Sequence, residues 1–365
     1  MFALCSLCPA VAESVSEMKS EFEFIKRIRA EAARHSDVSA DLVCGIGDDT
    51  AIISEREGRE TLITTDLLVE DVDFKLCYAP PRCLGHKALA VSLSDIAAMG
   101  GVPRYSLLTL AIPKQNPQST IHNPQLEEFW EEFFAGYFAL AEKCGVILIG
   151  GDISSAPERL TIDSVVIGQC RRGQAVRRGG AHVGDGIYVT GEVGRSAAGL
   201  ELLQRGERMS EGEERPAQKA VRAHLMPEAR VEFGRQVGER RLAQAMIDIS
   251  DGLAQDLAHI CADSGVGAVI EYDAVPVAAE VMLVAEDKKA AFALAVSGGE
   301  DYELLLTAGR EAEAELIAIS RACQVGLTRI GEITTASETE FESKLQLRRG
   351  GRLETLKARG YDHFL

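Results

Sequence analysis

The sequence predicts an α/β or α+β fold divided into two domains. The chain has 365 residues, 46% of them apolar, which is long for one domain and sufficient for two cores. Segments with strand and helix periodicity alternate along the chain. A stretch rich in arginine and glycine, 171–185, interrupts this alternation. We therefore expect one domain over residues 18–170 and a second over residues 171–365.

The first domain is expected to open with an amphipathic helix at 20–34, where Phe22, Ile25 and Ile28 share a face. A second helix is expected at 82–99, because Leu89, Leu93 and Ile96 recur at helical spacing and Gly100-Gly101 ends the pattern. The other expected elements are strands at 50–54, 61–74 and 105–112, a helix at 124–143, a short strand at 145–152 that breaks into glycines, and a strand at 159–170.

The second domain is expected to alternate in the same way. A charged stretch at 206–217 predicts a mobile loop. A strand, a turn and a helix are expected within 245–265, where Leu253, Leu257 and Ile260 lie on one helical face. The remaining expected elements are a strand at 186–191, a helix at 196–206 and a loop leading into a strand at 295–307.

Charge and cysteine usage exclude several classes of protein. The formal charge is −17, which disfavours a nucleic-acid partner and an anionic membrane surface. Nine scattered cysteines favour free thiols in a reducing cytoplasm. No apolar run reaches the roughly 18 residues of a membrane span. Residues 1–17 are interpreted as a disordered extension or a start-site artefact, with Met18 as the working start.

Aspartates lie at strand ends or in tight turns in five segments. Each one alone is explained by an Asx turn or a helix cap. Asp95, however, falls near the C-terminal end of its helix, where the helix dipole disfavours an anion by roughly 0.3–1 kcal/mol. Asp248 lies inside an apolar run and needs a partner. The residues are Asp48 and Asp49, Asp66, Asp95, Asp152, and Asp248 with Asp251.

Basic residues are scarce near these segments, so cations would have to hold the carboxylates together. Oxygen ligands, with the hydroxyls of Thr64, Thr65 and Ser250 nearby, favour Mg²⁺. None of the seven histidines has a cysteine or histidine at metal-ligand spacing. Several Mg²⁺ ions would suit a substrate with several phosphates.

The usual phosphate-binding motifs are missing. Neither the P-loop motif nor the protein-kinase motifs occur. A glycine-rich loop that opens a helix at 191–200 could hold an anion, although a tight turn explains it equally well. Arg177 and Arg178 could neutralise a phosphate or could belong to a solvated linker.

Several segments together resemble one known family. "GIGDDTAII", "LSDIAAMGG", "LIGGD", "IDISDGLAQDL", "SGGEDYEL" and the terminal "GYDHF" resemble thiamine-monophosphate kinases, which share a superfamily with aminoimidazole-ribotide synthetase and selenophosphate synthetase. The resemblance implies an aminoimidazole-ribotide synthetase-like fold. The N-terminal domain would bind metal and ATP, and its sheet would form a barrel across a homodimer. It implies γ-phosphoryl transfer from ATP to thiamine monophosphate.

The resemblance also implies roles for individual residues. Acceptor contacts would fall on Glu300, on Asp73, where the family often has histidine, and on Ala358, where it often has an aromatic residue near the substrate ring. That ring contact would then be missing or would come from Tyr361 or Phe364. Mg²⁺ ligands would be Asp49, Thr64, Thr65, Asp66, Asp95, Asp152, Asp248 and Asp251, and ATP contacts Gly151, Asp152, Arg178 and Ser250.

No catalytic base is expected, because a phosphate monoester is already anionic at neutral pH. Direct in-line transfer is therefore predicted. Two alternatives stay open: an ATP-dependent relative with another acceptor, and a nucleotide-binding protein without catalysis.

Overall fold

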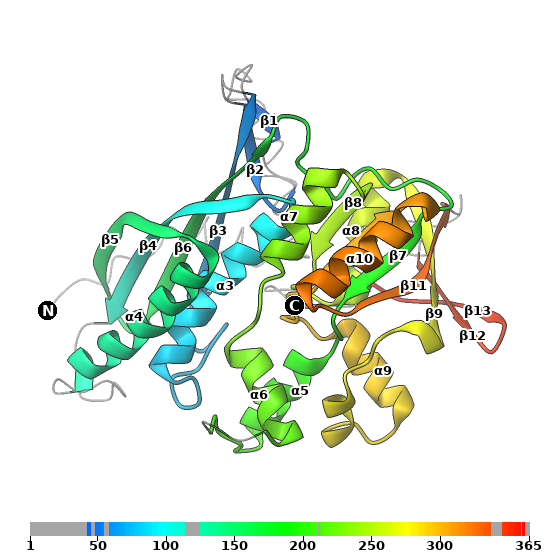
Figure 1. Ribbon diagram of the computed structural model, residues 1–365. Coiled ribbons are helices and arrows are strands. Elements are labelled where there is room, and N and C mark those ends of the chain that lie inside the picture. Colours follow the sequence, from blue (N-terminus) through cyan, green and yellow to red (C-terminus); the bar gives the residue numbers. More distant parts are fainter. Residues whose placement is uncertain are drawn as a thin grey trace, which may run out of the picture.

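The computed structural model of the chain describes residues 42–44, 48–54, 58–113, 125–210, 212, 214–336, 345–358 and 360–361. Two mixed sheets are covered by helices (Figure 1). Residues 1–17, the helix expected at 20–34, the glycines at 45 and 47, and Phe364 lie outside the described residues. The first sheet ends at Arg171 and the second begins at Gly186; the boundary at residue 171 stays a prediction.

The first sheet has six strands in the order β1-β2-β3-β6-β4-β5. Neighbouring strands are antiparallel except β4 and β5, which are parallel. The strands are β1 (Leu42–Cys44), β2 (Ala51–Ser54), β3 (Arg59–Val69), β4 (Val102–Pro113), β5 (Ile147–Ala156) and β6 (Thr161–Arg171).

Helix α3 (Pro81–Ala98) lies at the centre of the molecule. It packs on β3 and β6 and against α4 (Gln125–Cys144). It also packs against α7 (Val231–Arg240) and β8 (Ala245–Asp248) of the second half. Because neighbouring elements enclose this helix on all sides, most of its residues are buried. Its apolar side chains accordingly lie on every face of the helix and not on one face only. Leu89 and Ile96 belong to the core of the first sheet, whereas Ala97 and Ala98 belong to a core with Phe233. The helix expected at 82–99 is confirmed.

The second sheet has seven strands in the order β13-β12-β9-β11-β7-β10-β8, antiparallel except where β12 pairs with β9. Its inner strands are buried on both faces, because α8 and α9 cover one face and α7 and α10 the other. The strands are β7 (Gly186–Thr190), β8 (Ala245–Asp248), β9 (Val266–Glu271), β10 (Leu304–Ala308), β11 (Leu327–Thr335), β12 (Leu345–Arg349) and β13 (Arg352–Thr355). The helices are α5 (Arg195–Gln204), α6 (Pro216–Leu225), α7 (Val231–Arg240), α8 (Leu253–Ser264), α9 (Lys288–Ser297), α10 (Glu313–Cys323) and three short 3₁₀ helices, η1 (Tyr272–Ala274), η2 (Ala279–Leu283) and η3 (Arg310–Ala312).

The expectation that a strand breaks at Gly150-Gly151 is wrong. Strand β5 continues through both glycines to Ala156, in parallel register with β4. Gly151 has a φ of +151°, and a Cβ there would lie 1.8 Å from the carbonyl oxygen of Leu108. The glycine therefore permits close backbone pairing inside the strand. The loop expected at 206–217 is also shorter than predicted, since α6 begins at Pro216.

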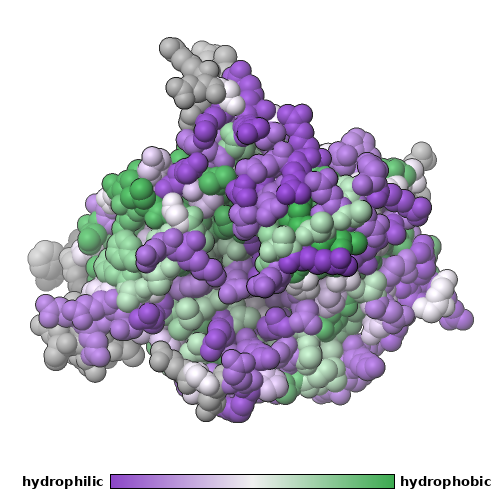
Figure 2. Space-filling model, viewed as in Figure 1, coloured by the Kyte–Doolittle hydropathy of each residue, from purple (hydrophilic) through white to green (hydrophobic). Residues whose placement is uncertain are grey.

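Strand β5 forms an edge of the first sheet and is exposed along most of its length. Ile147, Ile149 and Ile153 are exposed by 60%, 55% and 70%. Figure 2 shows hydrophobic surface in the region of this strand. Among the described helices, none combines the length and the hydropathy that crossing a bilayer requires.

Candidate active site

Four of the predicted aspartates gather where α3 meets the two sheets. Asp66 lies on the face of β3 that is turned toward α3, and Ser92 Oγ donates to its Oδ2 over 2.7 Å. Asp95, in the last turn of α3, accepts a short hydrogen bond from Thr64 Oγ1. Asp248 ends β8 and is 3% exposed. Asp49 lies shortly before β2, and its side chain is 4% exposed.

Burial and mutual repulsion both disfavour the charged forms of this cluster. Burial, and next the charges of Asp248 and Asp48, raise the pKa of Asp49 to about 7 although Arg178 opposes the shift. Burial and the neighbouring carboxylates raise the pKa of Asp66 and that of Asp248 to about 6. The pKa of Asp95 is raised well above its usual range by burial and then by Asp66, Asp248 and Asp49. The cluster therefore needs positive charge.

Arg178 supplies one positive charge. Its guanidinium is paired with Asp49 Oδ1 and lies 3.5 Å from Asp48 Oδ1. The Arg178 side chain is only 18% exposed, so it does not belong to a solvated linker. The other carboxylate oxygen of Asp49, Oδ2, is buried without a hydrogen-bond partner, which leaves it available as a ligand.

The donor set fits hard divalent cations. It consists of carboxylate and hydroxyl oxygens, which Mg²⁺ prefers, and it includes the unpaired Oδ2 of Asp49. In the part of the chain that the structure describes, one group offers three ligand atoms within 4.8 Å of one another: Asp251, Asp256 and His259. Of these, only Asp251 was predicted. Asp256 Oδ2 already accepts hydrogen bonds from the backbone N–H groups of Asp251 and Gly252.

Two predicted ligands lie apart from the cluster within one chain. Thr65 is exposed on the opposite face of β3, where its hydroxyl donates to Asp163 Oδ1 over 2.6 Å. Asp152 is exposed on β5, three strands from β3, or about 14 Å at roughly 4.8 Å per strand. Its Oδ1 accepts from the neighbouring Ile153 N–H. The roles of Thr65 and Asp152 as Mg²⁺ ligands stay predictions, and so do the ATP contacts expected at Gly151 and Asp152.

A cavity of about 530 Å³ connects the acidic cluster with the predicted acceptor contacts. Asp66, Ser250 and Asp251 line one part, and Glu300 another. Asp73 also lines it, while its Oδ2 accepts from the Val69 N–H over 2.8 Å. Ala358 is exposed and does not line the cavity, but Tyr361 does. Tyr361 therefore borders the expected acceptor site, while Phe364 lies outside the described residues, so the source of the ring contact stays a prediction.

Glu300 is held by two cations or donors that the sequence did not reveal. Lys87 Nζ lies 2.7 Å from Glu300 Oε1, and His224 Nδ1 lies 3.0 Å from Oε2. Burial would raise the pKa of Glu300, but Lys87 and then His224 outweigh it and lower the pKa to about 2. Glu300 is therefore ionised at neutral pH.

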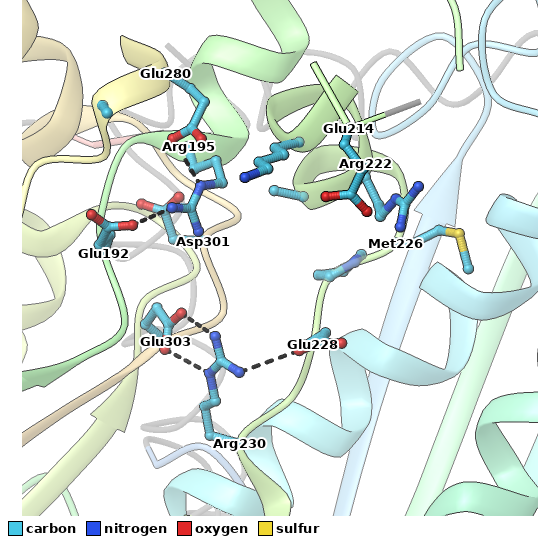
Figure 3. A pocket seen from close by; sticks show the side chains of 14 residues that line it. Glu192, Arg195, Glu214, Arg222, Met226, Glu228, Arg230, Glu280, Asp301 and Glu303 are labelled. Atoms are coloured by element: carbon cyan, nitrogen blue, oxygen red, sulfur yellow. Dashed lines mark hydrogen bonds and ion pairs between the residues drawn. The ribbon is translucent and has the colours of Figure 1, made fainter. Parts of the chain in front are cut away.

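A second cavity has a volume of about 590 Å³ (Figure 3). Six of its ten charged side chains pair with one another: Arg195 with Glu192 and Glu280, and Arg230 with Glu228 and Glu303. Its charges are thus largely neutralised internally.

Asp301 also lines this second cavity. Its carboxylate accepts hydrogen bonds from the N–H groups of Gly194 and Ser196, over 2.6 and 3.1 Å. Asp301 therefore occupies the N-terminus of α5, the place where the 191–200 loop could have held an anion.

The comparisons with known proteins match nearly the whole chain. The model of the AIR synthase related protein N-terminal domain matches residues 47–170, and that of the C-terminal domain matches residues 182–344. The thiamine-monophosphate kinase of Bacillus subtilis is 35% identical over 94% of this chain and 99% of the relative. This chain belongs to the thiamine-monophosphate kinase family. The enzyme of that name from Salmonella typhimurium is 39% identical over 89% of this chain and 93% of its own.

Solved structures of the thiamine-monophosphate kinase family share the fold. "AaThiL complexed with AMPPCP and TMP" is 30% identical, with a TM-score of 0.76 over 94% of this chain and 97% of that chain. The thiamine-monophosphate kinase of Stenotrophomonas maltophilia is 34% identical, with a TM-score of 0.70 over 90% and 96%. The hydrogenase maturation protein HypE of E. coli, at 17% identity and a TM-score of 0.62 over 91% and 97%, shares the fold alone.

Five residues of this family member's site were not predicted from its sequence. Lys87 could have been found, because it lies among the apolar residues of a mostly buried helix, where an ionisable side chain needs a partner. The other four carry no local signal that separates them from ordinary surface or cap residues. They are Asp163, His224, Asp256 and His259.

Proposed function

We propose that this chain transfers the γ-phosphoryl group of ATP to thiamine monophosphate, giving thiamine diphosphate and ADP. The observation that carries the proposal is the cavity that joins the buried aspartates to Glu300. Membership of the thiamine-monophosphate kinase family supports it, as does the related structure that holds AMPPCP and TMP.

Mg²⁺ would be held by the carboxylates of the cluster together with Thr64. When bound, Mg²⁺ would reduce the repulsion between two polyanions, which is about 4 kcal/mol per charge pair at 4 Å for an effective dielectric constant near 20. The ligands proposed from one chain are Asp49, Thr64, Asp66, Asp95, Asp248 and Asp251. Arg178, Ser250 and Gly151 are proposed ATP contacts. Thr65 and Asp152 lie apart from the cluster, so they would act as Mg²⁺ ligands only together with residues of a second copy of the chain.

In this scheme the residues of the chain itself orient the acceptor substrate and supply the negative charge that faces it. Glu300, ionised at neutral pH, would accept hydrogen bonds from the acceptor, and Asp73 and Tyr361 border the same cavity. The acceptor phosphate is anionic and needs no base. Direct transfer without a phosphorylated enzyme follows, because positioning and charge stabilisation supply the catalysis.

The chain is further proposed to act as a homodimer in the cytoplasm. The exposed isoleucines of the edge strand β5 support pairing with a second copy. Cys77, Cys144, Cys170 and Cys323 are free thiols, which suits a reducing compartment. Light scattering at micromolar concentration is expected to give twice the chain mass of 39.4 kDa, and Ile153→Lys is expected to shift the mass toward the monomer. A monomeric wild type would contradict the dimer.

A phosphoryl-transfer assay tests the function. ATP consumption is expected with thiamine monophosphate and not with thiamine, which lacks the phosphate acceptor. Chelation of divalent cations should abolish turnover, and readdition of Mg²⁺ should restore it. ATP turnover that does not depend on thiamine monophosphate would indicate another acceptor, and binding without turnover would indicate a nucleotide-binding protein. Trapping of an aspartyl phosphate would contradict direct transfer.

A further inference from the structure

Glu300 is the meeting point of three separate elements. Lys87 comes from α3 in the first half of the chain, His224 from α6, and Glu300 from the loop before β10. The side chains of Lys87 and His224 are each 3% exposed, whereas that of Glu300 is 27% exposed and borders the cavity. Lys87 does not line the cavity and therefore lies behind Glu300, on its protein side, whereas His224 lies beside Glu300 and reaches the cavity lining.

The backbone around Glu300 is held in an uncommon conformation. Glu300 has a φ of +64° and Tyr302 a φ of +50°, in the left-handed region that side chains rarely adopt. The Glu300 N–H donates to Ser250 O over 2.7 Å, and the Tyr302 N–H donates to Ile249 O over 2.9 Å. As a result Glu300 and Tyr302 line the first cavity, and Asp301 lines the second.

The two partners occupy different oxygens of the carboxylate. Lys87 reaches Oε1 and His224 reaches Oε2. Since each carboxylate oxygen can accept two hydrogen bonds, acceptor positions remain on the cavity side. Burial and then Lys87 lower the pKa of His224; a neutral imidazole with its proton on Nδ1 donates to Glu300. Ser196 Oγ lies 3.1 Å from the same nitrogen.

We propose that Lys87 and His224 are positioning residues that fix the orientation and the negative charge of Glu300 toward the hydrogen-bond donors of the acceptor substrate. They thereby set the affinity for thiamine monophosphate and not that for ATP. This inference rests on the proposed function. Because Lys87 and Glu300 belong to different halves of the chain, acceptor affinity depends on the contact between the halves.

The test compares Lys87→Met with wild type. Methionine keeps the unbranched shape and removes the charge, so Glu300 loses its partner on Oε1. KM for thiamine monophosphate should rise about 10–100-fold, while KM for ATP should stay within about twofold. Lys143→Met is the matched control, because Lys143 pairs with Glu228 at the surface, 3.9 Å away with both side chains over 60% exposed; it should leave both constants unchanged.

Two further variants separate positioning from folding. If Lys87 acts through Glu300, adding Lys87→Met to Glu300→Gln should change KM for thiamine monophosphate by less than about twofold. If Lys87→Met fails to fold, His224→Phe removes the donor on Oε2 and should raise the same KM about 3–10-fold.

The outcomes distinguish the two proposals. A wild-type protein that neither binds nor phosphorylates thiamine monophosphate overturns the proposed function and this inference with it. An active wild type with an unchanged KM in Lys87→Met overturns the inference alone. So does an equal loss of affinity for both substrates, or full additivity with Glu300→Gln, since either would assign Lys87 a general structural role.

Discussion

Replacing Asp66 by asparagine is expected to lower turnover with thiamine monophosphate by about 100–1,000-fold, the loss typical when a charged group that stabilises the transition state is removed. Asp66 lies at the junction of the acidic cluster and the cavity. Asparagine has nearly the same shape and can still accept from Ser92 Oγ, but it binds Mg²⁺ poorly. Steady-state kinetics at saturating Mg²⁺ measures the loss.

The same variant should be more stable than wild type when no divalent cation is present. The folded state disfavours the charged carboxylate, since burial and then neighbouring carboxylates raise the pKa of Asp66 to about 6. At pH 7.5 the wild type carries this unfavourable charge and the asparagine variant does not. We expect the melting temperature without divalent cation to rise by roughly 2–4 °C. Added Mg²⁺ should stabilise the wild type more than the variant.

Asp48→Asn is the control for Asp66→Asn. Asp48 neighbours the cluster and contacts Arg178, but its Oδ1 is already used by the Asp49 N–H. Turnover should fall less than tenfold, because Asp48 accepts from the Asp49 backbone and is not a proposed ligand. Full activity in Asp66→Asn would contradict the metal site, and a lower melting temperature without divalent cation would contradict the repulsion within the cluster.

Arg230→Met is expected to lower the free energy of unfolding by about 3–5 kcal/mol, the loss typical when one partner of a buried ion pair is removed. Arg230 precedes α7 and forms two hydrogen bonds with Glu303, whose side chain is 5% exposed. Glu303 also accepts from Thr190 Oγ1 over 2.6 Å. The substitution leaves a buried carboxylate without its cation (Figure 3). Urea unfolding followed by circular dichroism measures the difference.

The double variant Arg230→Met/Glu303→Gln should recover much of that loss, because no buried charge remains. Arg240→Met is the surface control: Arg240 pairs with Glu315 over 3.0 Å, but both side chains are 47% exposed. Its effect should be below about 1 kcal/mol. Equal losses for Arg230→Met and Arg240→Met would show that burial does not determine the strength of the pair.

The sequence correctly predicted those strands and helices whose apolar residues recur at a clear strand or helix period. The strand expected at 105–112 is confirmed as β4, and the helix at 124–143 as α4. The sequence prediction wrongly ended strand β5 at Gly150-Gly151, because two consecutive glycines usually indicate a turn when only the sequence is known. Only the partner strand shows that Gly151 allows the backbones to approach.

The candidate site was predicted by residue type more than by position. Asp49, Asp66, Asp95 and Asp248 stand out because carboxylates beside apolar strands need positive charge, and the fold brings them together. The pairing of Lys87 with Glu300 has no equivalent signal, since it joins residues far apart in the chain. The separation of Thr65 from Thr64 follows from strand alternation, which family resemblance alone did not take into account.

Helix α3 restricts how the molecule can move. Its C-terminal turn touches α7 so closely that a Cβ at Gly234 would lie 2.1 Å from the Ala97 carbonyl oxygen. A hinge between the two halves would have to pull this helix out of one of its two cores, which would expose well-packed apolar surface. Domain opening of the kind that many two-domain enzymes use is therefore unfavourable here. Movement of side chains and loops at the mouth of the cavity, and not separation of the two halves, therefore has to admit and release substrates.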